Sequence, residues 1–223
     1  GMEAIDIKEV QKIKRFIRRF SASLKKEYRS YNERENYWRR VAHFLSEEKE
    51  VDLMGSLVAI KELIGGIDPL TKLKNRRLFE EELKRRIIES RRYHFPLVLV
   101  LLDIDNFKTL NDEKGHLAGD IFLKKLGKIL RESVNMEWEV FRIGGDELAI
   151  IMAHASLRDA EILISKIKRR LERILREKTY VALSKPLGVS FGKSGWDEAE
   201  TIDEFKEKTD VALYREKKLK KNG

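Results

Sequence analysis

The apolar residues of the first 64 positions recur at intervals of three and four residues, which is the spacing of one face of an amphipathic helix. Three stretches carry this pattern, at residues 10–31, 37–45 and 51–63. Gly65 and Gly66 then interrupt it, as glycines do at a helix C-terminus. The pattern predicts a small all-helical module over residues 1–64. Its simplest role is packing or dimerisation, and ligand sensing is the alternative.

From Ile67 onward, helical and strand-like segments alternate. Asn75 is a candidate N-cap for the first helix, and the apolar run Leu97–Asp103 has the length of a buried strand. The later segments are a helix around 121–130, β-like runs at 139–143 and 148–152, a basic helix near 157–177, a strand at 187–191 and a last helix from about 202. This order predicts an α/β (α+β) domain over residues 65–223, with helices flanking a mixed central sheet.

The composition narrows the classes of function. The 223 residues include no cysteine, which excludes disulfides, thiolate catalysis and cysteine-bound zinc. The 47 basic and 38 acidic residues give a net charge of +9, which is typical of a surface rich in ion pairs or of a protein that attracts polyanions such as nucleotides. We find no apolar run near the ~20 residues of a membrane span and no signal-peptide pattern, so we expect a cytoplasmic protein.

Two acidic pairs are candidates for chemistry. Asp103 and Asp105 end the buried strand, and strand alternation sends both carboxylates to one side while Ile104 points the other way. Asp146 and Glu147 lie at the tip of the predicted hairpin. Carboxylates on neighbouring strand ends are the hard oxygen ligands that Mg²⁺ prefers, although acidic residues at turns are often only solvated.

Gly144 and Gly145 precede the second acidic pair. Two glycines allow a turn to adopt positive φ, and they also allow the backbone to approach a ligand closely. A hairpin turn alone explains the glycines, but it does not explain two carboxylates directly after them.

Five sequence blocks, in order, resemble the GGDEF family of diguanylate cyclases. They are the opening block Asp68–Arg77, the block from Asp103 to Asp120, the signature Arg142-Ile-Gly-Gly-Asp-Glu-Leu148, the strand Gly188–Gly192, and the closing block Asp210–Tyr214 with Lys217, Lys221 and Asn222. The resemblance covers residues 67–223. It implies a ferredoxin-like, palm-type nucleotide cyclase fold.

The resemblance also implies a metal site. Asp103, the Ile104 carbonyl and Asp146 would hold Mg²⁺, for which Mn²⁺ can substitute. Glu147 would be a further ligand or a base toward the attacking 3′-hydroxyl. These acidic residues and Lys108 form the expected catalytic set.

The same resemblance implies a GTP site. Asn111 and Asp120 would bind the guanine, because an aspartate that accepts from guanine N–H groups rejects adenine. The remaining substrate-binding residues would be Phe107, Gly144 and Gly145, together with Lys108, Lys217 and Lys221, which would neutralise the triphosphate. Lys221 stands where arginine is common, so a bidentate phosphate contact is lost while the charge is kept.

The implied reaction joins two GTP molecules into cyclic di-GMP and releases two pyrophosphates. One chain would present one GTP, so the active form should be a homodimer, with no nucleic acid partner. Two alternatives are an inactive domain that responds to GTP or cyclic di-GMP, and a different cyclase or polymerase-like nucleotidyltransferase.

Two positions depart from the family pattern. Leu148 replaces the usual phenylalanine after the acidic pair, and we expect it to lie in the core, where it affects packing more than chemistry. Many family members carry R-x-x-D before the hairpin strand, where product docks. The matching residues here are Asn135 and Trp138, so we expect no product inhibition at that site.

Overall fold

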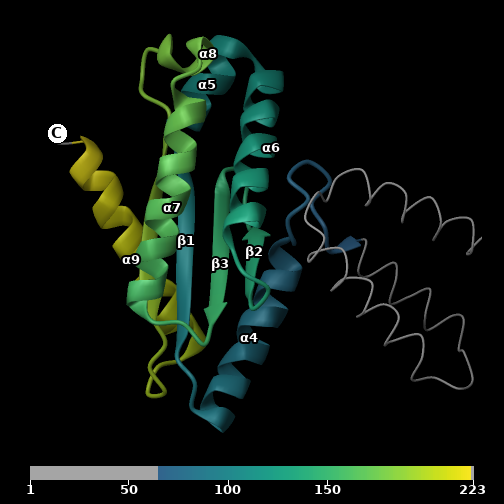
Figure 1. Ribbon diagram of the computed structural model, residues 1–223, viewed down its shortest axis with the longest axis vertical. Coiled ribbons are helices and arrows are strands. Elements are labelled where there is room, and N and C mark those ends of the chain that lie inside the picture. Colours follow the sequence, from purple (N-terminus) through teal and green to yellow (C-terminus); the bar gives the residue numbers. More distant parts are fainter. Residues whose placement is uncertain (1–64, 222–223) are drawn as a thin grey trace, which may run out of the picture. The chain divides into compact units, whose positions relative to one another are not determined.

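The computed structural model of the protein describes residues 65–221, so the helical module expected at 1–64 lies outside the described residues (Figure 1). The described elements, in chain order, are α4 (Arg76–Tyr93), β1 (Leu97–Asp105), α5 (Phe107–Lys114), α6 (His116–Ser133), β2 (Trp138–Arg142), β3 (Glu147–Ala153), α7 (Leu157–Leu175), α8 (Lys178–Val181), β4 (Gly188–Gly195) and α9 (Ile202–Lys221). Both the hairpin and the flanking helices expected from the sequence are present.

The strands form one sheet in the order β2-β3-β1-β4, and all three pairings are antiparallel. The α+β class is therefore confirmed, but the expectation of a mixed sheet is wrong for these four strands. Within residues 65–221, the parallel pairing reported is a single bridge between Lys74 and Phe141. β1 is an interior strand, because it pairs with β3 on one side and with β4 on the other.

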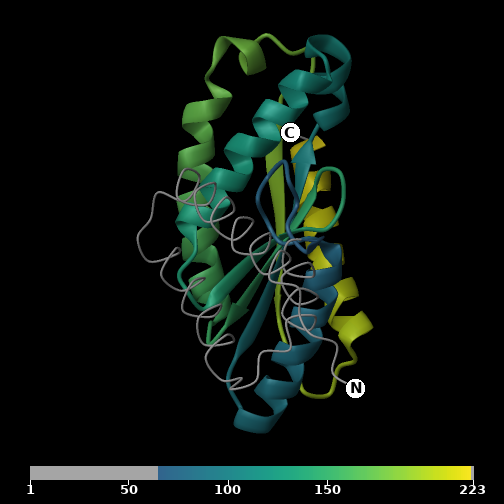
Figure 2. The same cartoon turned by 90° about the vertical axis from the view of Figure 1, so that its right-hand side faces the viewer.

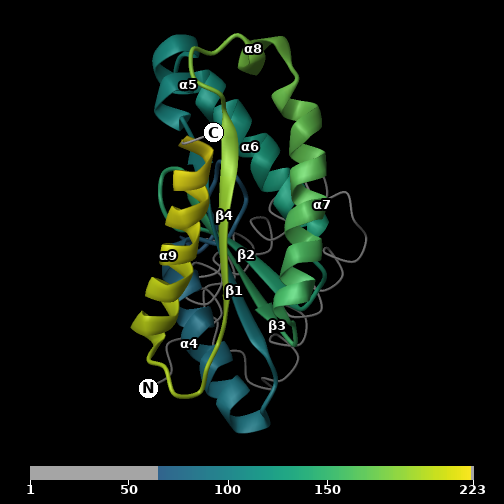
Figure 3. The ribbon, with the colours of Figure 1, turned by 90° about the vertical axis from the view of Figure 1, so that its left-hand side faces the viewer.

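Helices cover both faces of the sheet (Figures 2 and 3). Alternation along β1 sends Val100 and Leu102 into the core beneath α6 and α7, and Leu99 and Leu101 into the core beneath α4 and α9. Burial of apolar surface in these two layers is the main stabilising contribution, at about 25 cal/mol per Å². The sandwich leaves the strand ends free to carry polar residues.

Several boundaries follow from local chemistry. Asn75 caps α4 as expected, because its Oδ1 accepts from the Leu78 backbone N–H at 3.1 Å. The single helix expected around 121–130 is preceded by the separate helix α5. The chain turns between the two at Gly115, whose φ of 85° suits glycine and whose N–H donates to the Asn111 carbonyl at 2.9 Å.

Among residues 65–221, we find no helix with the length and apolar character needed to cross a bilayer.

Candidate active site

Three strand ends meet at one edge of the sheet, where β1 finishes and β3 and β4 begin. The pairing places Asp103 opposite Glu147 on β3 and opposite Ser190 on β4. The Ile104 N–H also donates to the Asp146 carbonyl at 3.1 Å. The two predicted acidic pairs are therefore brought to the same edge by backbone hydrogen bonds.

Asp103 is the centre of this group of charges. Lys217 of α9 places its Nζ 2.7 Å from Asp103 Oδ1. This contact is an ion pair without good hydrogen-bond angles, since the buried Oδ1 has no well-aligned hydrogen-bond partner among the described residues. Burial raises the pKa of Asp103, and the charges of Asp146 and Glu147 raise it further, while Lys217 opposes the shift. The charges of Asp146 and Glu147 thus act on the Asp103 carboxylate, although burial is the larger cause of the raised pKa of Asp103.

Asp105 lies on the same side of β1 and has its own partners. Ser190 Oγ donates to Asp105 Oδ1 at 2.7 Å, and Lys220 Nζ donates to Asp105 Oδ2 at 2.8 Å. The expectation that both aspartates point one way is confirmed, because both contact the lysines of α9. Ser190 and Lys220 were not among the residues expected at the site.

The two glycines of the hairpin do not have the backbone conformation that was expected of them. Neither Gly144 nor Gly145 adopts positive φ, so that reason for glycine is wrong here. Gly144 instead leaves space for Glu147, because a Cβ at this position would lie 2.6 Å from Glu147 Oε2. A Cβ on Gly145 would meet no atom within 4 Å, so its backbone stays open to a ligand.

Arg142 links the glycine hairpin to the loop that carries Asp68. Its guanidinium donates to the carbonyls of Gly144 and Gly145, at 3.2 Å and 2.8 Å, and to Asp68 Oδ2 at 3.1 Å. Asp68 also accepts from the backbone N–H and hydroxyl of Thr71, at 2.8 and 2.6 Å. Burial alone would raise the pKa of Asp68, but these hydrogen bonds and the charge of Arg142 outweigh it and lower the pKa. Asp68 and Arg142 both lie in blocks that match the family, but no role was predicted for either residue.

The residues expected to bind guanine lie along α5 and the start of α6. Gly119 allows α6 to pack against α5, because a Cβ there would lie 2.0 Å from Asn111 Oδ1 and 3.1 Å from the Phe107 ring. Asp120 follows directly and is exposed. Asn111 and Phe107 of α5 therefore pack against Gly119, the residue before Asp120, and α5 begins two residues after β1 ends.

Two predicted phosphate-binding lysines do not contact the carboxylates. Lys108 is 89% exposed and pairs with Asp112 at 2.9 Å, and this hydrogen bond raises the pKa of Lys108. Lys221 is exposed at the end of α9, and none of the ion pairs found in residues 65–221 includes it. Both ammonium groups are accessible to an anion.

The carboxylate oxygens at the strand ends are suitable ligands for a divalent cation, although they do not form a preassembled metal site. Among residues 65–221, no three acidic or histidine side chains converge closely enough to hold a metal ion. However, Asp103 Oδ1 is a buried carboxylate oxygen whose close contact with Lys217 is not a well-aligned hydrogen bond, and the charges of Asp146 and Glu147 act on the same carboxylate. The ligand set Asp103, Ile104, Asp146 and Glu147 stays a prediction that these oxygens support.

An open hollow of about 1130 Å³ lies elsewhere, at the other end of β4. It is lined by Trp196, the C-terminal part of β4 and one face of α9 between Glu204 and Arg215. It includes none of the residues expected at the site.

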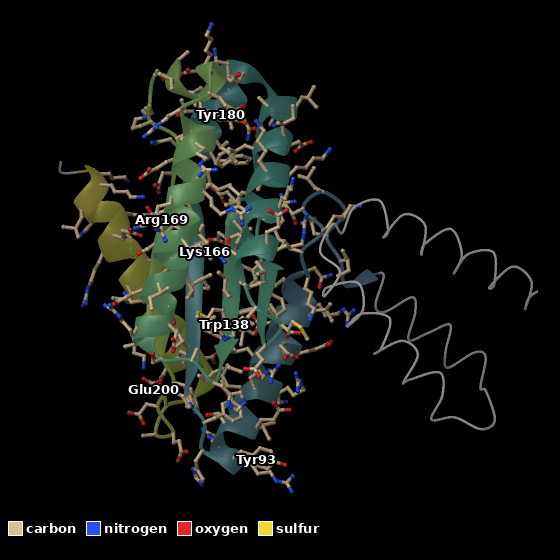
Figure 4. The ribbon with its side chains drawn as sticks, in the orientation of Figure 1. Tyr93, Trp138, Lys166, Arg169, Tyr180 and Glu200 are labelled. Carbon is tan, nitrogen blue, oxygen red and sulfur yellow. The ribbon has the colours of Figure 1, made fainter. Side chains whose placement is uncertain are left out.

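Both departures from the family pattern have a structural account. Leu148 is fully buried beneath α6 and α7, as expected. Asn135 uses its Oδ1 to accept from the N–H groups of Glu137 and Trp138, at 3.0 and 3.1 Å. Trp138, labelled in Figure 4, donates its Nε1–H to the Ala153 carbonyl at 3.2 Å. Both side chains are therefore engaged within the protein.

The domain is an antiparallel α+β sandwich with acidic side chains at facing strand ends, beside the lysines of α9. Such a fold hosts many functions, so the family is assigned by comparison. The chain belongs to the GGDEF family: residues 66–223 match the family model described as "Diguanylate cyclase, GGDEF domain".

Two relatives named as diguanylate cyclases are similar to this chain. Diguanylate cyclase DgcS of Shewanella oneidensis is 34% identical over 157 residues, which are 70% of this chain and 50% of DgcS. Diguanylate cyclase DosC of Escherichia coli is 30% identical over 223 residues, which are 97% of this chain and 48% of DosC. The chain thus spans about half the length of these relatives.

The fold is similar to solved structures of the family. The GGDEF domain of DgcB from Caulobacter crescentus, crystallised with c-di-GMP, has a TM-score of 0.63 and 28% identity, and covers 69% of this chain and 90% of that one. A longer DgcB structure with its coiled coil has a TM-score of 0.68 and 25% identity, over 79% of this chain and 93% of that one.

Proposed function

We propose that this chain is a diguanylate cyclase of the cytoplasm, which condenses two GTP molecules into cyclic di-GMP and two pyrophosphates. The observation that carries the proposal is the meeting of Asp103, Asp146 and Glu147 at facing strand ends, beside Lys217. The names of the relatives and the c-di-GMP bound to DgcB support it.

The reaction is two phosphoryl transfers. In each, the 3′-oxygen of one GTP forms a bond to the α-phosphorus of the other, and the bond to the β-phosphate oxygen breaks to release pyrophosphate. The proton of the 3′-hydroxyl passes to a base, for which exposed Glu147 is the candidate. Such transfer depends mainly on positioning and on neutralising charge.

Asp103, the Ile104 carbonyl, Asp146 and Glu147 are the residues that would hold Mg²⁺, or Mn²⁺ in its place. The bound ion would neutralise the charge that develops on the phosphates. Lys217 pairs with Asp103 in this structure, so we expect its ammonium to turn to the triphosphate when substrate binds. Lys108 and Lys221 are exposed and would add positive charge to the same ligand.

Base selection would come from the helix pair α5 and α6. Asn111 and Asp120 would pair with the polar edge of guanine, and the Phe107 ring would lie against its apolar face. Gly144 and Gly145 would let the hairpin backbone approach the phosphates. Adenine lacks the N1–H and exocyclic amine that Asp120 would accept from, so ATP should be a poor substrate.

Each chain would bind one GTP, and the active species would be a homodimer with its two sites face to face. We also propose that product does not inhibit through the usual R-x-x-D position, because Asn135 and Trp138 provide neither the guanidinium nor the carboxylate. Submicromolar inhibition by cyclic di-GMP that is lost on mutation of residues 135–138 would contradict this.

The test is incubation of the chain with GTP and Mg²⁺, followed by chromatography of the products. We expect the wild type to form cyclic di-GMP, and Asp146→Ala to form it about 100-fold more slowly or slower still. Asp197→Asn removes an exposed carboxylate beyond the far end of β4, and this control should keep the rate.

Two other outcomes would contradict the proposal. Binding of GTP or cyclic di-GMP without turnover would assign the chain to the inactive, ligand-responsive domains. A different product from mixed nucleotides would make it another kind of nucleotidyltransferase.

A further inference from the structure

Two lysines of α9 reach two aspartates of β1 at the candidate site. Lys217 Nζ lies 2.7 Å from Asp103 Oδ1, and Lys220 Nζ lies 2.8 Å from Asp105 Oδ2. The lysines are three residues apart, so they project from the same side of the helix. The aspartates are two residues apart on one side of the strand. Each lysine therefore has a carboxylate of its own.

Lys220 is fixed in place by two acceptors on different strands. It donates to Asp105 at the end of β1 and to the Val189 carbonyl of β4, both at 2.8 Å. Asp105 is held as well, by the hydroxyl of Ser190 at 2.7 Å. A Cβ on Gly188 would lie 3.1 Å from Asp105 Oδ2, so the strand packs closely against this carboxylate.

Lys217 lies between the two carboxylates, and Asp105 competes for it. Its Nζ is 2.7 Å from Asp103 but also 4.0 Å from Asp105 Oδ1. Both aspartate side chains are less than one fifth exposed, so water screens their charges only partly. Without Lys220, the charge of Asp105 would draw Lys217 away from Asp103.

We propose that Lys220 is a positioning residue, which neutralises Asp105 so that Lys217 stays directed at Asp103 and available to the triphosphate of GTP. The part of this inference that concerns GTP rests on the proposed function. The placement of Lys217 does not, and it can be measured without nucleotide.

The first experiment measures KM and kcat for GTP in a double-mutant cycle. We expect Lys220→Met to raise KM about tenfold, with a smaller change in kcat, and Asp105→Asn alone to change KM less than twofold. The double variant should return to within about twofold of the wild-type KM, because the competing charge is gone. Lys220→Arg, which keeps the charge, should restore most of the affinity.

Lys218→Met is the matched control. Lys218 is the exposed neighbour on α9, and its ammonium lies 5.0 Å from the centre of the Tyr214 ring, away from the aspartates. This variant should keep the wild-type KM. The melting temperature of every variant is measured as well. A raised KM in a variant that melts at the wild-type temperature is a positioning effect and not a loss of fold.

The second experiment uses no nucleotide. The full chain and its variants are labelled with a limiting amount of an amine-reactive reagent, and the modification of Lys217 is measured by mass spectrometry. We expect Lys217 to be modified about threefold less in Lys220→Met, since the unneutralised charge of Asp105 then draws its ammonium toward this half-buried carboxylate, and to be modified as in the wild type in the double variant.

The two readouts separate the possible failures. If no variant turns over GTP but Lys217 labelling follows the cycle, the proposed function fails and the positioning role stands. Unchanged Lys217 labelling in Lys220→Met, or a raised KM that Asp105→Asn does not rescue, would overturn the positioning role.

Discussion

At the scale of single residues, the ion pair of Asp68 and Arg142 fixes the loops around the site. Arg142 joins the opening loop, through Asp68, to the two carbonyls of the glycine hairpin. Both side chains are less than one fifth exposed, so the pair is better protected from solvent than an ordinary surface salt bridge. Its loss should therefore affect stability as well as the position of the hairpin.

Replacing Asp68 by asparagine tests this pair through pH. At pH 7 we expect Asp68→Asn to lower the free energy of unfolding by about 1–3 kcal/mol, because a charged acceptor is lost. The hydrogen bonds of Asp68 lower its pKa in the folded state, so its contribution is fully present above the unfolded-state pKa of about 3.9. It is lost as the pH falls through the lower, folded-state pKa.

Urea unfolding at pH 7 and near pH 3 measures how much the free energy of unfolding differs between the wild type and Asp68→Asn. This difference in free energy should be smaller at the lower pH. A gap that stays constant or grows as the pH falls would show that the carboxylate charge is not what stabilises this loop.

At the scale of elements, the position of α9 depends on one glycine of β4. A Cβ on Gly192 would lie 2.2 Å from the Leu213 nitrogen and 2.6 Å from the Thr209 carbonyl oxygen, which are both backbone atoms of the helix. The buried hydroxyls of Ser194 and Thr209, 2.6 Å apart, join the same two elements. The backbones of β4 and α9 are therefore in direct contact at Gly192, about one helical turn before Lys217.

Gly192→Ala should push α9 off the sheet. We expect a loss of about 1–3 kcal/mol in the free energy of unfolding, as for other overpacked sites, together with a raised KM for GTP because Lys217 moves with the helix. Chemical denaturation and steady-state kinetics measure the two effects.

Gly195→Ala is the matched control on the same strand. The atom nearest to its added Cβ would be Leu157 Cγ at 4.0 Å, which is an ordinary contact. Equal losses of stability in the two variants would show that close packing at Gly192 is not the cause.

The sequence predicted elements whose signals are local. The Asn75 cap and the apolar run of β1 each appear within a few residues, and five matched blocks supported the carboxylates and the helix residues of the site. The antiparallel direction of every strand pair, in contrast, depends on how distant segments meet. Lys220 appeared only as part of a basic tail, because its partners Asp105 and Val189 lie 115 and 31 residues away in the chain.

At the scale of the whole molecule, one chain supplies only half of the proposed reaction. In the proposed function a single site binds one GTP, whereas ring closure needs two attacking hydroxyls and two leaving groups. We therefore expect two copies of the chain to act together.

Mixing wild type with Asp146→Ala tests this expectation at constant total protein concentration. An equal mixture, allowed to exchange, should show about a quarter of the wild-type activity, because only pairs of two intact chains complete the ring. An equal mixture with Lys218→Met, in which both chains keep the site, should keep full activity. A mixture with Asp146→Ala that retains one half would mean that each chain acts alone.

The central position of β1 has a practical consequence. Since β1 is paired on both sides, a slip of one residue would turn its two aspartates into the apolar core under α6 and α7, and would move Val100 and Leu102 to the opposite face, under α4 and α9. Such a chain would aggregate and would not survive purification. If a soluble, folded preparation lacks turnover, the cause is therefore sought in its side chains or its partner and not in the register of β1.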